Sequence, residues 1–144
     1  MLVAIILIAV VAITTTILLI IHNNRGGLNM PSVEFREIDL SEPYWSGRFW
    51  DDVGVDIEKT VDLSQFANQT IESKEMAESI ANVILEQEQD KGFLENFVLR
   101  RIEHDPIKNI WIFRYDIQPS VPGMSYFAAV DGDTSQLLRM WVDS

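Results

Sequence analysis

The pattern that most constrains the fold lies in residues 110–117, which read Ile-Trp-Ile-Phe-Arg-Tyr-Asp-Ile. The odd positions of this stretch are all apolar or aromatic, whereas charge enters on the even positions at Arg114 and Asp116. Side chains along a β-strand point alternately to the two faces of a sheet, so a period of two indicates a strand with one face in a core. We therefore predict a strand here, central in its sheet.

Three more short strands are predicted around this one. Proline, glycine, asparagine and aspartate separate the apolar stretches, and these residues favour turns. The predicted strands are 97–104, 110–117, 124–130 and 136–142, with turns at 105–109, 118–123 and 131–135. Short links between successive strands favour an antiparallel meander. We expect the last third of the chain to form a four-stranded antiparallel sheet.

One amphipathic helix is predicted before the sheet. Ser73 is a suitable N-cap, Glu75 suits the positive end of the helix dipole, and Gly92 can end the helix after Lys91. Apolar residues recur between them at three- and four-residue spacing, and the acidic residues Glu78, Glu86, Glu88 and Asp90 fall outside that stripe. One apolar stripe facing one apolar sheet makes a two-layer core. We therefore expect an α+β domain over residues 73–144, with one main helix packed on the sheet.

Residues 2–21 form a second strongly constrained segment. The segment has no charged residue, and its only polar side chains belong to three threonines. At about 1.5 Å per residue, a helix of this length spans the roughly 30 Å hydrocarbon core of a bilayer. A signal peptide would have a basic start, a shorter apolar run and a small-residue cleavage site, and none is clear here. We predict an uncleaved single-pass transmembrane anchor over residues 1–22, in preference to a signal peptide or a buried helix.

The orientation of this anchor has two readings. His22 and Arg25 follow the apolar run, and no lysine or arginine precedes it, a bias that would leave the domain in the cytoplasm. The charged N-terminal amine opposes this single arginine, and short N-terminal anchors commonly carry their domain outside. We expect a single-pass protein of the cell membrane with an extracytoplasmic domain, and the cytoplasmic orientation is the alternative.

The charge of the chain limits its partners. All 22 acidic and all 11 basic residues follow the apolar run, so the tethered part carries the entire net charge of −11. A surface of this sign repels phosphate backbones, and nucleic acid is therefore not expected as a partner. We interpret residues 23–72 as an acidic, aromatic-containing linker and approach segment, most acidic between Glu34 and Asp62.

An aromatic cluster lies within this acidic segment, with four aromatic residues among the eight from Pro43 to Trp50. Tryptophan and tyrosine are enriched at the hot spots of protein interfaces, so we hypothesise a partner-binding surface. Its residues are Tyr44, Trp45, Phe49, Trp50, Asp51, Asp52 and Asp56. The alternative is that the rings pack on the sheet or at the membrane surface. In that case the binding face is expected on the exposed side of the sheet, around Arg100, Arg114 and Arg139.

The sequence contains no recognisable catalytic or cofactor-binding motif. Cysteine is absent, and His104 is the only histidine of the domain, which at a strand end we expect to be structural. Asp131-x-Asp133-x-Ser135 is similar to the start of a calcium loop, but Gln136 stands at the position of the loop glycine. We interpret this stretch as a hairpin turn whose side-chain oxygens bind backbone amides. We expect a non-enzyme without metal, cofactor or small-molecule substrate.

The order of helix, strands and turns in residues 73–144 also carries a family resemblance. Its residues are Ala77-Glu78-Ser79-Ile80-Ala81, Trp111-Ile112-Phe113, Pro119, Pro122-Gly123, Tyr126, Val130-Asp131-Gly132 and Leu137-Leu138-Arg139. This order resembles the NTF2-fold immunity proteins of bacterial toxin systems, which implies a small α+β protein that binds and neutralises a toxin without catalysis. The helix-then-sheet order, with an aspartate turn before the last strand, is also similar to PepSY domains. That likeness implies an extracytoplasmic regulator or inhibitor of a protease.

The two resemblances lead to one general expectation and two specific ones. We expect a membrane-tethered, non-catalytic domain that binds a protein, with residues 2–21 in the membrane. An immunity-type inhibitor of a toxin is the first specific hypothesis, and a PepSY-like regulator of a protease is the alternative.

Overall fold

The computed structural model describes residues 32–45, 55–56, 60–119 and 124–143. All of them belong to one compact unit, Ser32–Ser144. The predicted transmembrane run 2–21 lies outside these residues. Within the described ranges, no helix has both the length and the apolar character needed to cross a membrane.

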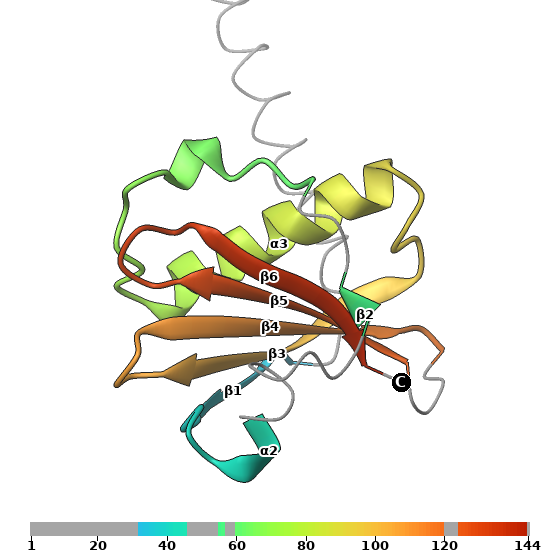
Figure 1. Cartoon of the computed structure of the whole chain (residues 1–144). Coiled ribbons are helices and arrows are strands. Elements are labelled where there is room, and N and C mark those ends of the chain that lie inside the picture. Colours follow the sequence, from blue (N-terminus) through green and yellow to red (C-terminus); the bar gives the residue numbers. More distant parts are fainter. Residues whose placement is uncertain (1–31, 46–54, 57–59, 120–123, 144) are drawn as a thin grey trace, which may run out of the picture. The chain divides into compact units, whose positions relative to one another are not determined.

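One long helix lies across a β-sheet (Figure 1). The elements in chain order are β1 (Glu34–Glu37), α2 (Pro43–Trp45), β2 (Val55–Asp56), η2 (Ser64–Phe66), α3 (Lys74–Asp90), β3 (Phe97–Asp105), β4 (Ile110–Ile117), β5 (Ser125–Asp131) and β6 (Leu137–Asp143). The strand order in the sheet is β1-β3-β4-β5-β6-β2. Strands β3, β4, β5 and β6 pair antiparallel in succession, β1 is parallel to β3, and β2 is antiparallel to β6. The fold is therefore α+β with one mixed sheet.

The predicted fold class, the single main helix and the antiparallel meander are confirmed, with β4 in the middle of the sheet. The prediction of a purely antiparallel, four-stranded sheet is wrong, because β1 and β2 extend the sheet at its two edges. Both added strands come from the segment that was interpreted as a linker. The four residues of β1 are all exposed, and β2 has only two residues, so neither strand shows the alternation that marks a half-buried strand.

The predicted ends of the helix are confirmed. The Ser73 hydroxyl accepts a hydrogen bond from the Met76 amide at 3.2 Å, as expected of an N-cap. After the helix, Gly92 has a φ of +79°, a backbone conformation that glycine adopts without steric cost. The expectation that Glu88 lies outside the apolar stripe is wrong, because its side chain is buried and lies 3.0 Å from the ammonium of Lys91. Glu88 follows Ile84 by four residues and therefore belongs to the apolar stripe by position.

The main core lies between α3 and one face of the sheet. The odd positions of β4 face this core, with Trp111, Phe113 and Tyr115 all buried, as the alternation predicts. The helix contributes Ala77, Ile80, Ala81 and Ile84, and the other strands contribute Leu99, Ile102, Tyr126, Ala128, Val130 and Met140. The buried Tyr115 hydroxyl donates a hydrogen bond to the Ala81 carbonyl at 2.8 Å. This bond ties the central strand to the middle of the helix.

A second apolar cluster covers part of the opposite face of the sheet. Its members are Leu40, Trp45, Ile110, Ile112, Phe127, Ala129 and Trp141. Leu40 and Trp45 come from the segment between β1 and the end of α2, so this segment packs on the sheet. The even side of β4 is thus apolar at Ile110 and Ile112 and becomes polar only from Arg114 onward. This change along one strand places the candidate site described below.

We predict that Trp111→Ala lowers the free energy of unfolding by about 3 to 5 kcal/mol, the range for large aromatic residues removed from a core. Trp111 is buried and its ring stacks on the His104 ring, with centroids 4.0 Å apart. The measurement is chemical denaturation of the variant against the wild type. Ile107→Ala is the control, because Ile107 is 82% exposed and its loss should change stability by only about 0.5 kcal/mol. A loss below about 1 kcal/mol for Trp111→Ala would contradict the packing described for β4.

Candidate functional site

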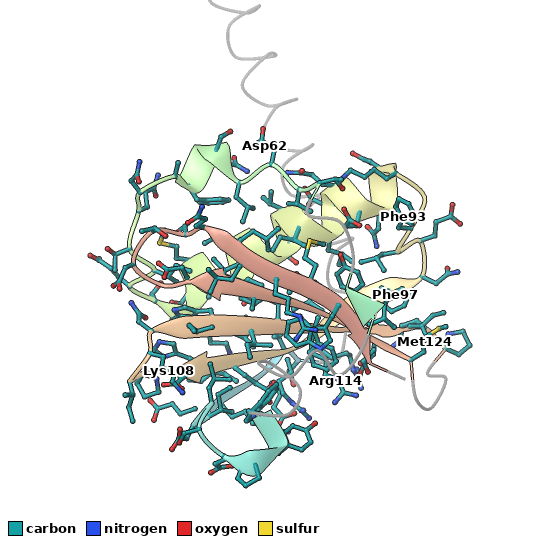
Figure 2. The ribbon with its side chains drawn as sticks, in the orientation of Figure 1. Asp62, Phe93, Phe97, Lys108, Arg114 and Met124 are labelled. Carbon is teal, nitrogen blue, oxygen red and sulfur yellow. The ribbon has the colours of Figure 1, made fainter. Side chains whose placement is uncertain are left out.

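A cleft lies on the face of the sheet opposite α3 and has a volume of about 610 Å³. In Figure 2 the labelled Arg114 lies on this side of the strands, away from α3. The sheet supplies the floor with Arg36, Arg101, Glu103, Arg114 and Phe127. The walls come from the stretch between the end of β1 and the end of α2, with Glu37, Ile38, Asp39, Glu42, Tyr44 and Trp45, and from the β3–β4 turn, with Pro106 and Ile107.

The buried carboxylate of Asp105 connects the two walls. Its Oδ2 accepts a hydrogen bond from the Leu40 amide at 2.9 Å. Its Oδ1 accepts hydrogen bonds from the amides of Ile107 and Lys108 at 2.8 and 2.9 Å. Burial acts to raise the pKa of Asp105, but the three backbone donors outweigh it and hold the pKa below its ordinary value. One side chain therefore holds the loop after β1 and the turn after β3 in place.

We predict that Asp105→Asn lowers the free energy of unfolding at neutral pH by about 2 to 3 kcal/mol. Asparagine has only one acceptor oxygen, and its NH₂ group would meet a backbone N–H donor. Since the folded pKa of Asp105 is lowered, its contribution is complete above the unfolded value of about 3.9 and is lost as the pH falls through the folded pKa. The loss in the variant should therefore shrink in acid. Chemical denaturation at several pH values measures both effects.

Asp39→Asn is the matched control for this prediction. Asp39 is an aspartate of the same wall, but within the described residues its carboxylate accepts hydrogen bonds only from the amide and hydroxyl of Ser41. Both contacts are exposed, so water can replace them and the loss of stability should be much smaller than for Asp105. Equal losses in the two variants would show that Asp105 does not connect the walls.

Glu103 is the buried charge of the cleft floor. Its side chain is only 2% exposed, and its Oε1 lies 3.6 Å from Arg36 Nε and 3.8 Å from Arg101 Nη1. Its Oε2 is buried and makes no hydrogen bond to any residue that the structure describes. Burial raises the pKa of Glu103, and the guanidinium groups of Arg101, Arg36 and Arg114 reduce this shift without cancelling it. The neutral form of the Glu103 carboxyl group is therefore more favoured in the folded protein than in water.

Three arginines surround this carboxyl group, and we call Arg36, Arg101 and Arg114 the arginine cluster. Arg101 donates from Nε to Glu34 Oε2 at 2.8 Å, and Arg36 Nε lies 3.4 Å from the other oxygen of Glu34. Arg114 donates from Nε to Asp116 Oδ1 at 2.8 Å, and its guanidinium lies 5.9 Å from the centre of the Phe127 ring. Each arginine is therefore held through Nε by an acidic neighbour on the sheet.

The pKa of Glu103 gives a prediction for the pH dependence of stability. A carboxyl group whose folded pKa is raised stabilises the fold below its unfolded pKa, and that stabilisation is lost as the pH rises through the folded pKa. Glutamine cannot ionise, so Glu103→Gln should gain stability relative to the wild type as the pH rises from 4 to 7, roughly the range above the unfolded glutamate pKa. Thermal unfolding across this range measures the difference. A constant difference between the two proteins would contradict a raised pKa.

Two of the residues proposed from the sequence as the partner-binding surface have described side chains. Tyr44 is 53% exposed and lines the cleft. Trp45 is 6% exposed and packs in the second apolar cluster, with its ring edge-on to that of Tyr44 at 5.1 Å. Phe49, Trp50, Asp51 and Asp52 lie outside the described residues, and Asp56 is described only as part of strand β2. Trp45 therefore packs on the sheet, as the alternative interpretation of these rings predicts.

The sequence interpretation did not single out the arginine cluster as a group or the buried Glu103. Arg114 was named only in the alternative, together with Arg100 and Arg139. A usable signal is Glu103 itself, a glutamate that directly follows Ile102 near the end of the predicted strand 97–104. Arg36 had no such signal, because only the parallel pairing of β1 with β3, which aligns Arg36 with Glu103, brings it to the site.

His104 and Asp131, the other residues that the sequence analysis considered for chemistry, make contacts that stabilise the fold. His104 Nε2 lies 3.1 Å from Asn109 Oδ1, and its ring stacks on Trp111. Asp131 Oδ1 accepts hydrogen bonds from the Asp133 and Thr134 amides and from the Thr134 hydroxyl, which confirms the interpretation of this stretch as a hairpin turn. Within the described part of the chain, no group of three or more histidine, cysteine or acidic side chains is placed to hold a metal ion.

No protein-family model matches this chain, and neither a curated protein nor a solved structure matches it.

Proposed function

We propose that this chain is a membrane-tethered, non-catalytic protein-binding domain that acts as an immunity-type inhibitor of a bacterial toxin. The cleft is the observation that carries the proposal, because its lining combines guanidinium groups, aromatic rings and apolar side chains. Tyrosine, tryptophan and arginine dominate the hot spots of protein interfaces. The resemblance of residues 73–144 to NTF2-fold immunity proteins supplies the kind of partner.

The proposed tether rests on the composition of residues 2–21, which contain no charged side chain and are long enough to span a bilayer. The rest of the chain carries the whole net charge of −11, and charge of this size favours solubility at the membrane surface. We place the domain on the extracytoplasmic side, where a toxin delivered from outside would first meet it.

The acidic, aromatic segment is proposed to extend the binding surface from the cleft. Tyr44 belongs to the wall of the cleft, and the segment continues from there through Phe49, Trp50, Asp51 and Asp52. Charges at the edge of an interface mainly increase the rate of association, whereas large rings slow dissociation. A partner with a basic surface is therefore expected.

A PepSY-like regulator or inhibitor of a protease is the second candidate. The feature that favours it is the tight turn at Asp131 directly before the last strand, since that turn and the helix-then-sheet order are what this chain shares with PepSY domains. A protease partner would also enter the cleft, so the identity of the captured protein separates the two candidates.

Site-specific cross-linking tests the proposed function. A photoreactive residue placed at Ile107, an 82% exposed residue of the cleft wall, should cross-link the partner when the full chain is exposed to the proteins of the producing cells. The same residue at Phe93 is the control, because Phe93 is 70% exposed and does not line the cleft. The partner should be captured from Ile107 and not from Phe93.

The captured protein must then respond to the chain in a functional assay. A toxin should lose its activity when the full chain is added at an equal molar amount, whereas a protease partner would support the PepSY-like alternative. Neutralising Asp51, Asp52 and Asp56 together should slow association with the partner and weaken its salt dependence. Equal cross-linking from both positions, or a partner whose activity does not change, would refute the proposed function.

A further inference from the structure

The hydrogen-bonding groups of the cleft floor are incompletely used. Oε2 of Glu103 is buried and makes no hydrogen bond within the described residues. Leaving a buried polar atom without a partner is unfavourable, so a bound ligand that supplies the partner would relieve an existing penalty. Arg36 and Arg114 make their ion pairs within the described structure through Nε, which leaves the Nη groups of both residues as donors.

The charges of the floor indicate what kind of ligand fits. Arg36, Arg101 and Arg114 bring three positive charges, and Glu103 is the one acidic residue among the floor side chains. Glu34 and Asp116, which are not part of the cleft lining, pair with the Nε groups of these arginines. A planar guanidinium presents paired N–H donors that match the two oxygens of a carboxylate. Oε2 of Glu103, which makes no hydrogen bond within the described residues, can accept one from a backbone N–H of the same ligand.

The rim of the cleft has the opposite charge, and this adds selectivity. Asp39 and Glu42 line the cleft outside the floor. These carboxylates repel a free anion that approaches alone, but they attract a ligand that carries a positive charge next to its carboxylate. Repulsion of the wrong partner is a common source of specificity in interfaces.

We propose that the cleft binds an acidic side chain of the partner protein, with its carboxylate on the arginine cluster and with an adjacent basic residue of the same partner segment at the rim formed by Asp39 and Glu42. This inference rests on the proposed function, and it specifies the residues of the partner that enter the cleft. It also reconciles the acidic character of the chain with a basic floor, because the partner segment carries both charges.

Short blocked peptides test the inference without knowledge of the partner. The probes are acetyl-Gly-Glu-Lys-amide, the same peptide with glutamine in place of glutamate, the same peptide with glycine in place of lysine, and sodium acetate. Binding is followed through the arginine Nε–H signals of the full, isotope-labelled chain in a neutral detergent. The Glu-Lys peptide should bind about tenfold more tightly than the glutamine peptide, as expected when a charge-assisted hydrogen bond is lost. Removing the lysine should weaken binding by a smaller factor, and acetate should bind most weakly.

Variants of the chain locate the binding site. Arg36→Gln and Arg114→Gln should each weaken binding of the Glu-Lys peptide about tenfold, the scale of one charged hydrogen bond. Arg100→Gln is the matched control. It removes the same single positive charge, but Arg100, a residue of β3, does not line the cleft. Thermal unfolding of each variant checks that the domain remains folded.

Two results with the peptides would overturn the inference. The glutamine peptide could bind as well as the glutamate peptide, or Arg100→Gln could weaken binding as much as the cluster variants. The proposed function has a separate outcome, because it requires only that the cross-linked partner is captured through Ile107 and inhibited. A partner that is inhibited equally well by Arg36→Gln and Arg114→Gln would leave the proposed function intact and reject this inference.

Discussion

The burial of β4 on both of its faces is the constraint around which the domain is organised. Its odd positions pack against α3, where the Tyr115 hydroxyl also bonds to the Ala81 carbonyl. Its even positions at Ile110 and Ile112 pack against Leu40 and Trp45 on the other side. A strand buried on both faces requires cover from two layers, and the second layer comes from the segment between β1 and α2. The attachment of that segment is therefore part of the fold and not an addition to it.

The candidate site lies where this second layer ends. Along the even face of β4 the side chains change from Ile112 to Arg114, and the apolar cover gives way to the cleft. The buried carboxylate of Asp105 holds both walls by accepting three backbone hydrogen bonds. The same elements thus stabilise the second apolar cluster and shape the cleft. A change in the loop after β1 is expected to affect stability and binding together.

Electrostatics distinguish the two buried acids of β3. Asp105 meets three backbone donors, so its ionised form is stabilised in the fold. Glu103 lies two residues earlier, where the guanidinium groups only partly compensate its burial. The first arrangement is what a structural carboxylate requires. The second keeps an incompletely satisfied group beside three arginines, which is typical of a site that binds a ligand.

Local patterns in the sequence determined the α3 helix with its Ser73 cap, the four strands of the meander and the turn at Asp131, because each depends on residues close together in the chain. Tertiary structure decided the positions of β1 and β2, the burial of Trp45 and Glu88, and the arginine cluster. Arg36 and Glu103 meet only because β1 adds to the sheet parallel to β3. A four-residue exposed strand shows no periodic pattern of its own. The candidate cleft therefore follows from a long-range strand pairing that no local pattern specifies.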